Sequence, residues 1–157
     1  MSFRKLPFVL SLFSLCLLVA SLGACRHQDD EAQLKETVDS FATNYYNWRF
    51  EAAKAYCTPE SGRWLRYAAS QVHQEDVDVL KAQAQGAKYE IQDIAYADND
   101  TTATISISVR DFLRMDTIGT VAHLTKEAAY TFTAVRRNEK WKVALSSLPR
   151  ALKEQKQ

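Results

Sequence analysis

Cysteine, glycine and proline are scarce in this chain, whose 157 residues include three cysteines, four glycines and three prolines. So few glycines leave no glycine-rich loop of the kind that cradles phosphate groups. The three histidines, His27, His73 and His123, are scattered, and the sequence has neither a close cysteine pair nor a His-Glu helix motif. Zinc sites need such ligands at short spacing. The sequence therefore predicts no metal site and indicates no cofactor.

An excess of charge of one sign is also missing. Lysine and arginine number 20 and aspartate and glutamate 19, so the formal net charge is only +1. Nucleic-acid-binding domains usually carry a clear basic excess or a basic stripe. We therefore expect no nucleic acid among the partners of this protein.

A long apolar run occurs only near the N-terminus, where Arg4 and Lys5 precede the segment from Leu6 to Leu22. A charged start followed by an apolar region is typical of a secretory signal. The run is short for a permanent membrane span. We interpret residues 1–24 as a signal peptide; an uncleaved anchor helix is the alternative.

The apolar run ends in Leu22-Gly23-Ala24-Cys25, and these four residues resemble the lipobox of bacterial lipoproteins. The resemblance implies cleavage before Cys25 and attachment of several acyl chains, such as palmitate, to this cysteine. Several chains give stable attachment to a membrane where one would be marginal. Residues 25–32 would then be the lipidated cysteine and a polar tether.

Two features of the tether bear on location. Arg26 differs from the aspartate associated with inner-membrane retention in enteric bacteria, which favours the outer membrane. The acidic run Asp29-Asp30-Glu31 resembles the surface-export signal of Bacteroides lipoproteins. We expect a lipid-anchored envelope protein at the outer membrane, on its periplasmic side or at the cell surface.

Cys57 is the one cysteine that remains once the signal peptide is removed and Cys25 is lipidated. A single cysteine excludes an internal disulfide. Cys57 follows Tyr56 at the end of an apolar helical pattern, which favours a buried structural role over that of a nucleophile.

Residues 33–147 have the pattern of a single domain that begins with helices. Apolar residues recur at helical spacing, and the pattern continues through Tyr56 and stops at Thr58-Pro59. A second helical stretch follows, as two helices or one bent helix, and ends before Gly86. The first stripe consists of Leu34, Val38, Phe41, Tyr45 and Trp48.

From Tyr89 onward the period changes to that of strands. The alternation slips out of phase near Gln92-Asp93, which predicts a bulge. The next strands have clear inward-facing sets, and short turns join them, which predicts an antiparallel meander and an α+β fold. Residues 148–157 are expected to be a polar tail. The inward sets are Ala103, Ile105, Ile107 and Val109; Tyr130, Phe132 and Ala134; and Trp141, Val143 and Leu145.

The order of elements resembles the cystatin-like cone of the nuclear-transport-factor-two-like superfamily, in which a long first helix lies across a curved sheet. The resemblance rests on the segments Asn47–Ala53, Thr58–Ser61 and Asn138–Val143. The Gly-Asp pair usual after the first helix is here Trp48-Arg49. A sheet-on-helix fold of another lineage is the alternative.

In this superfamily a pocket often opens between the first helix and the concave face of the sheet. Asp111 continues the inward series of its strand, and a carboxylate in an apolar cavity would have the raised pKa that suits proton transfer. The alternative is that the strand bulges or ends near Arg110, so that Asp111 turns outward. Other candidates for the pocket are Tyr45, Trp64, His123 and Tyr130.

Two functions remain open. One is a membrane-tethered domain without catalytic activity that binds a small molecule or an envelope protein, with a homodimer through the sheet as a further possibility. The other is a ketosteroid-isomerase-like enzyme that uses Asp111 as its pocket carboxylate. The strands offer no second acid or tyrosine pair for such chemistry, which favours the binding domain.

Overall fold

The computed structural model describes residues 28–115 and 119–152. The chain divides into two units, Met1–Lys35 and Glu36–Gln157. The described part of the first unit, residues 28–35, is helical. All other described elements belong to the second unit, and the interpretation of residues 1–24 and Cys25 lies outside the described residues. No helix in the described ranges is long and apolar enough to span a membrane.

The first helix ends at residue 45, earlier than its apolar pattern predicts. Its last turn closes with a Schellman motif, in which Arg49 N–H donates to Asn44 O at 2.8 Å and Trp48 N–H to Tyr45 O at 3.0 Å. Trp48 has the left-handed φ of 60° that this cap requires. A separate short helix, α2 (Phe50–Lys54), follows. The expectation that the helical pattern continues through Tyr56 is thus corrected. The spacing of apolar residues does not reveal that Trp48 forms the C-terminal cap of the first helix.

The remaining helices are short. A 3-10 turn, η1 (Pro59–Ser61), leads into α3 (Gly62–Ser70), and α4 (Gln74–Ala82) comes next. Asp76 is completely buried and accepts backbone N–H groups from His73 and Ala122, both at 2.8 Å. These two hydrogen bonds fix the start of α4 against the chain before β3.

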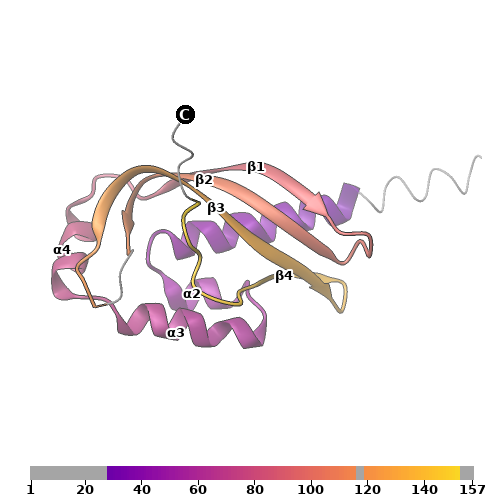
Figure 1. The fold of residues 1–157 in the computed structure, drawn as a ribbon, viewed down its shortest axis with the longest axis horizontal. Helices are drawn as coiled ribbons and strands as arrows, with labels where there is room; N and C mark the ends of the chain where they lie inside the picture. Colours follow the sequence, from indigo (N-terminus) through magenta and orange to yellow (C-terminus); the bar gives the residue numbers. More distant parts are fainter. Residues whose placement is uncertain (1–27, 116–118, 153–157) are drawn as a thin grey trace, which may run out of the picture. The chain divides into compact units, whose positions relative to one another are not determined.

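The sheet has four antiparallel strands in the order β1-β2-β3-β4: β1 (Lys88–Tyr96), β2 (Thr102–Arg114), β3 (His123–Arg137) and β4 (Lys140–Ala144). The predicted meander is confirmed. The register of β1 on β2 shifts between Ile91 and Asp93, which confirms the predicted bulge. Figure 1 shows β2 and β3 curving strongly.

The core lies between the curved sheet and residues 36–45 of the first helix. Phe41 packs against Phe132 of β3 with ring centroids 5.3 Å apart, and Thr37 donates to the backbone oxygen of Trp141 at 3.4 Å. Every residue of the three predicted inward sets is buried. The predicted α+β fold class is therefore confirmed: helices packed on a curved four-stranded antiparallel sheet.

Candidate functional site

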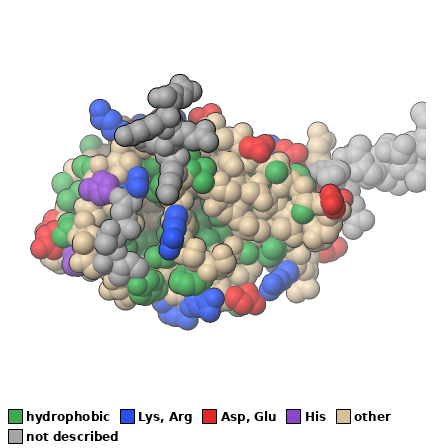
Figure 2. All heavy atoms as spheres, viewed as in Figure 1, with side chains coloured by type: hydrophobic (Ala, Val, Ile, Leu, Met, Phe, Trp, Pro, Cys, Tyr) green, Lys and Arg blue, Asp and Glu red, His purple; other side chains and the backbone are tan. Residues whose placement is uncertain are grey.

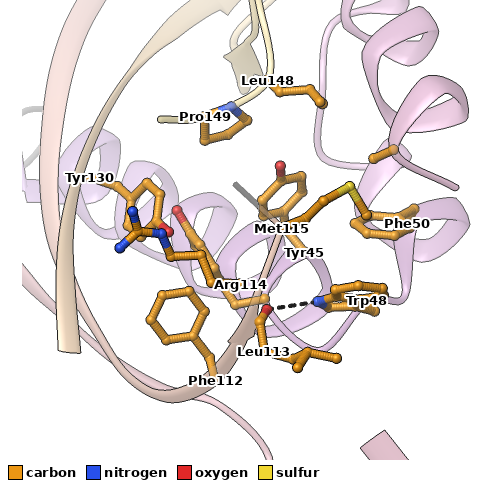
Figure 3. Close-up of a pocket in the computed structure, with 12 residues that line it drawn as sticks. Tyr45, Trp48, Phe50, Phe112, Leu113, Arg114, Met115, Tyr130, Leu148 and Pro149 are labelled. Carbon is orange, nitrogen blue, oxygen red and sulfur yellow. Dashed lines mark hydrogen bonds between the residues drawn. The ribbon is translucent and has the colours of Figure 1, made fainter. Parts of the chain in front are cut away.

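A narrow pocket lies where the end of the first helix meets the end of β2 and the middle of β3. Its volume is about 50 Å³. In the view of Figure 3, Phe112, Arg114 and Tyr130 lie on one side, Trp48 and Phe50 on the other, and Leu148 and Pro149 above. The full lining is Tyr45, Tyr46, Trp48, Phe50, Ala68, Phe112, Leu113, Arg114, Met115, Tyr130, Leu148 and Pro149.

Trp48 joins the helical wall of this pocket to the sheet. Its indole N–H donates to the backbone oxygen of Leu113 at 3.0 Å, shown as the dashed line in Figure 3. A bulky residue at positive φ is an outlier, since glycine normally occupies this position of a helix cap. A left-handed conformation costs a non-glycine residue about 1–3 kcal/mol. This conformation of Trp48 places its indole in the pocket wall.

Asp111 sets the direction of the end of β2, but it does not enter the pocket. Pairing with β3 keeps one register from Arg110 opposite Glu127 to Phe112 opposite Thr125, while Asp111 itself has a φ of 55°. This left-handed residue shifts the side-chain alternation by one, so Arg110 and Asp111 are both exposed and Phe112 is buried. The placement of Asp111 in a cavity is corrected in favour of the outward-turned alternative.

The aromatic rings of the inner pocket contact one another edge to face or tilted. Tyr46, Phe112 and Tyr130 form a triangle with centroid distances of 5.0, 5.8 and 5.9 Å. Tyr45 packs against Phe50 at 5.6 Å. Such contacts stabilise an aromatic cluster beyond simple area burial. The cavity therefore has walls of packed aromatic rings.

The phenol groups of Tyr45 and Tyr46 in these walls stay protonated at neutral pH. Burial is the main cause that raises the pKa of Tyr45 far above its ordinary value, and electrostatic repulsion from Tyr130 adds to the shift. Burial likewise raises the pKa of Tyr46, with further contributions from Tyr45 and Tyr130. The buried Tyr46 hydroxyl has no hydrogen-bond partner among the described residues. The walls thus offer neutral hydroxyl groups and no base.

A wider groove continues from the inner pocket towards α3 and has a volume of about 420 Å³. Five residues line both spaces: Arg114, Met115, Tyr130, Leu148 and Pro149. The groove alone adds Trp64, Tyr67, Ser147, Arg150 and Ala151. Figure 2 shows hydrophobic side chains, in green, gathered in a hollow on this face, with Lys or Arg side chains, in blue, beside it. Together the two spaces reach the size of ordinary small-molecule sites.

The predicted pocket residues separate into two groups. Tyr45 and Tyr130 line the inner pocket, and Trp64 lines the groove. Asp111 and His123 are exposed and line neither space. His123 begins β3 opposite Arg114, so its backbone is close to the site although its side chain is no part of the wall.

Several lining residues escaped sequence reasoning. Phe112 and Arg114 follow the change of phase at Asp111, which no periodicity reveals. Leu148 and Pro149 belong to the expected polar tail, yet Ala151 pairs with Tyr130 and Leu152 N–H donates to Ala129 O at 2.8 Å. The described part of that tail thus lies along β3 and closes one side of the groove.

Cys57 lies apart from the pocket and has the character of a core residue. It is 6% exposed, and its thiol is 3.5 Å from the backbone oxygen of Ala53. Burial raises the pKa of the Cys57 thiol to about 12, although nearby Lys142 opposes the shift. A thiol that stays protonated is a poor nucleophile. In the described ranges, no cluster of three histidine, cysteine or acidic side chains could hold a metal ion.

No family model matches the chain. No curated protein sequence matches it either. Among solved structures, it is similar to a protein of unknown function from Mycobacterium tuberculosis, with 9% sequence identity and a TM-score of 0.47. The alignment covers 82% of this chain and 74% of the other. At this similarity, nothing about function follows from the match.

Proposed function

We propose that this protein is a lipid-anchored component of the bacterial envelope whose domain binds a small, largely apolar molecule without chemical conversion. The observation that carries the proposal is the aromatic pocket with its attached groove. Preformed concave sites lined by apolar and aromatic side chains, with few polar groups, are typical of small-molecule binding.

The character of the lining supports binding over catalysis. Aspartate, glutamate and histidine are absent from the described residues that line the pocket and the groove. General acid–base catalysis needs a group that exchanges a proton near neutral pH. The buried phenols cannot do so, because their pKa values are raised. The enzyme alternative depended on Asp111 in the cavity, and the exposed position of Asp111 removes its support.

The anchor belongs to the proposal through the Leu22–Cys25 motif. In a bacterial host, Cys25→Ser should abolish labelling by a palmitate analogue and leave the protein either uncleaved or free of the membrane. Cys57→Ser and Cys16→Ser are matched controls that should remain labelled. Labelling of the Cys25→Ser protein would refute the lipoprotein interpretation.

The pocket can be tested by filling it. Ala68 is 2% exposed and lines the inner pocket, whereas its neighbour Ala69 is exposed and lines neither space. Ala68→Leu should block binding of a neutral apolar fluorescent probe such as N-phenyl-1-naphthylamine, because its larger side chain occupies the cavity. Ala69→Leu, on the same helix, should bind as the original protein does.

Circular dichroism and thermal unfolding must show that both variants are folded. Equal probe binding by the two folded variants would contradict the proposal that this pocket holds the ligand.

A further inference from the structure

We infer that the ligand is a small amphipathic anion, with an apolar end in the inner pocket and one anionic oxygen group, a carboxylate or a phosphate, in the groove at Arg114 and Arg150. This inference rests on the proposed function of the pocket and specifies the chemistry of its ligand.

The two spaces differ in character and adjoin each other. The inner pocket is aromatic and small, so it accepts only the tip of a ligand, whereas the groove can hold the larger part. Five residues line both spaces, so a ligand in the groove lies directly beside the inner pocket. An elongated ligand with an apolar end fits this arrangement better than a compact polar one.

The charge at the junction is positive. Arg114 lines both spaces and is partly buried, while Arg150 lines the groove and is exposed. None of the described residues that line either space carries a carboxylate. Two arginines from different segments, the end of β2 and the stretch after Pro149, therefore line the groove, and none of the other described lining residues is acidic.

The position of Arg114 suits recognition of an oxygen anion. A guanidinium has five N–H donors in a planar fork and binds carboxylate or phosphate in a bidentate manner. Arg114 also takes part in an interaction with another group of the chain. Partial burial lowers the local dielectric, so attraction to an anion is stronger here than at an open surface.

The same arrangement discriminates against other ligands. A cationic head group would be repelled by Arg114 and Arg150. A neutral alcohol of equal length would gain the apolar contacts but lose the charge-assisted hydrogen bonds, which are about twice as strong as neutral ones.

The test uses the full chain with Cys25→Ser, and measures displacement of the neutral probe N-phenyl-1-naphthylamine by four ligands of one chain length: decanoate, decyl phosphate, decanol and decylamine. Decanoate or decyl phosphate should bind at least about tenfold more tightly than decanol, the factor expected from one charge-assisted interaction. The relative affinity of the two anions identifies which head group the site prefers.

Arg114→Met should reduce the affinity for the preferred anion about tenfold and leave decanol unchanged. Arg110→Met is the matched control, because Arg110 is exposed on the same strand and lines neither space. Equal binding of decanol and the anions, or equal effects of the two arginine variants, would overturn the inference while leaving the pocket proposal intact. Failure of all four ligands to displace the probe, together with insensitivity of the probe to Ala68→Leu, would overturn both.

Discussion

The hydroxyl groups of Tyr46 and Tyr89 differ in whether they have a hydrogen-bond partner among the described residues. Tyr46 is 4% exposed, and its buried hydroxyl lacks a hydrogen-bond partner among the described residues. The hydroxyl of Tyr89 donates to the carboxylate of Asp39 and to the backbone oxygen of the same residue. Burying an unpaired polar group costs about 1–3 kcal/mol, whereas a satisfied hydrogen bond contributes about 1 kcal/mol.

We predict that Tyr46→Phe leaves the free energy of unfolding unchanged or raises it by about 1 kcal/mol, since it removes an unpaired hydroxyl and keeps the ring. Tyr89→Phe should lower that energy by a similar amount. Urea unfolding at neutral pH, followed by circular dichroism, measures both. Destabilisation of Tyr46→Phe beyond that of Tyr89→Phe would show that the Tyr46 hydroxyl has a partner in solution.

Cys57 should resist thiol reagents as long as the domain is folded. Its burial and its pKa of about 12 leave almost no thiolate at neutral pH. We predict that, in the Cys25→Ser protein without its signal peptide, iodoacetamide modifies Cys57 only after denaturant is added. Mass spectrometry would detect the adduct. Rapid modification in native buffer would contradict the buried position.

At the scale of the element, the end of β2 depends on the backbone of Asp111. Its φ of 55° is tolerated by aspartate better than by a β-branched residue, and glycine adopts it without steric cost. We predict that Asp111→Gly retains stability within about 1 kcal/mol. Asp111→Val should destabilise by about 1–3 kcal/mol and weaken probe binding, because the strained residue directly precedes the pocket wall.

Thermal unfolding and probe titration of the two variants test this element. Val109 is a fully buried β-branched residue on the same strand, so β2 accepts a β-branched side chain elsewhere. A loss of stability in Asp111→Val would therefore reflect the positive φ at residue 111. If Asp111→Val is as stable as Asp111→Gly, the left-handed turn in β2 is absent in solution.

The β3–β4 hairpin shows the same dependence on backbone geometry. Asn138 and Glu139 connect Arg137 to Lys140 and both have positive φ, of 51° and 62°. This is the geometry of a type I′ turn, for which Asn-Gly is preferred. We predict that Glu139→Gly raises the free energy of unfolding by up to about 1 kcal/mol. A loss of stability in urea unfolding would argue against the turn type.

For the whole molecule, the raised pKa values determine the response to alkaline pH. Burial raises the pKa of Tyr89 to about 12, with the Asp39 contact adding to it, and raises those of Cys57, Tyr45 and Tyr46 as well. In the unfolded chain the thiol and phenols ionise near their ordinary values of about 8.5 and 10. The folded protein therefore holds more protons, and its stability falls as pH rises.

We predict that this contribution is fully present below about pH 8 and is lost progressively towards pH 12. Urea unfolding at a series of alkaline pH values measures it, and phenolate absorbance reports the titration. Tyr89→Phe should flatten the decline, because it removes one of the groups. Constant stability across this range would mean that these phenols are solvated in the folded state.

Sequence pattern alone predicted the fold class and most of the core. The strand residues Ile105, Phe132 and Trp141 were assigned to the inward face by period-two alternation, and the bulge near Gln92 by a break in that alternation. Such inferences succeed because a pleated strand alternates its side chains and only one face of this sheet meets the helix. The Leu22–Cys25 motif likewise carries its prediction without reference to the fold.

The tertiary structure decided the pocket. Trp48 and Asp111 adopt left-handed backbone conformations that neither composition nor periodicity indicates, and each redirects the wall residues that follow it. Arg114 and Pro149 come together only because β3 curves and the chain after β4 returns along it. A pocket is formed by segments distant in sequence, so its lining depends on curvature and backbone turns that local patterns do not encode.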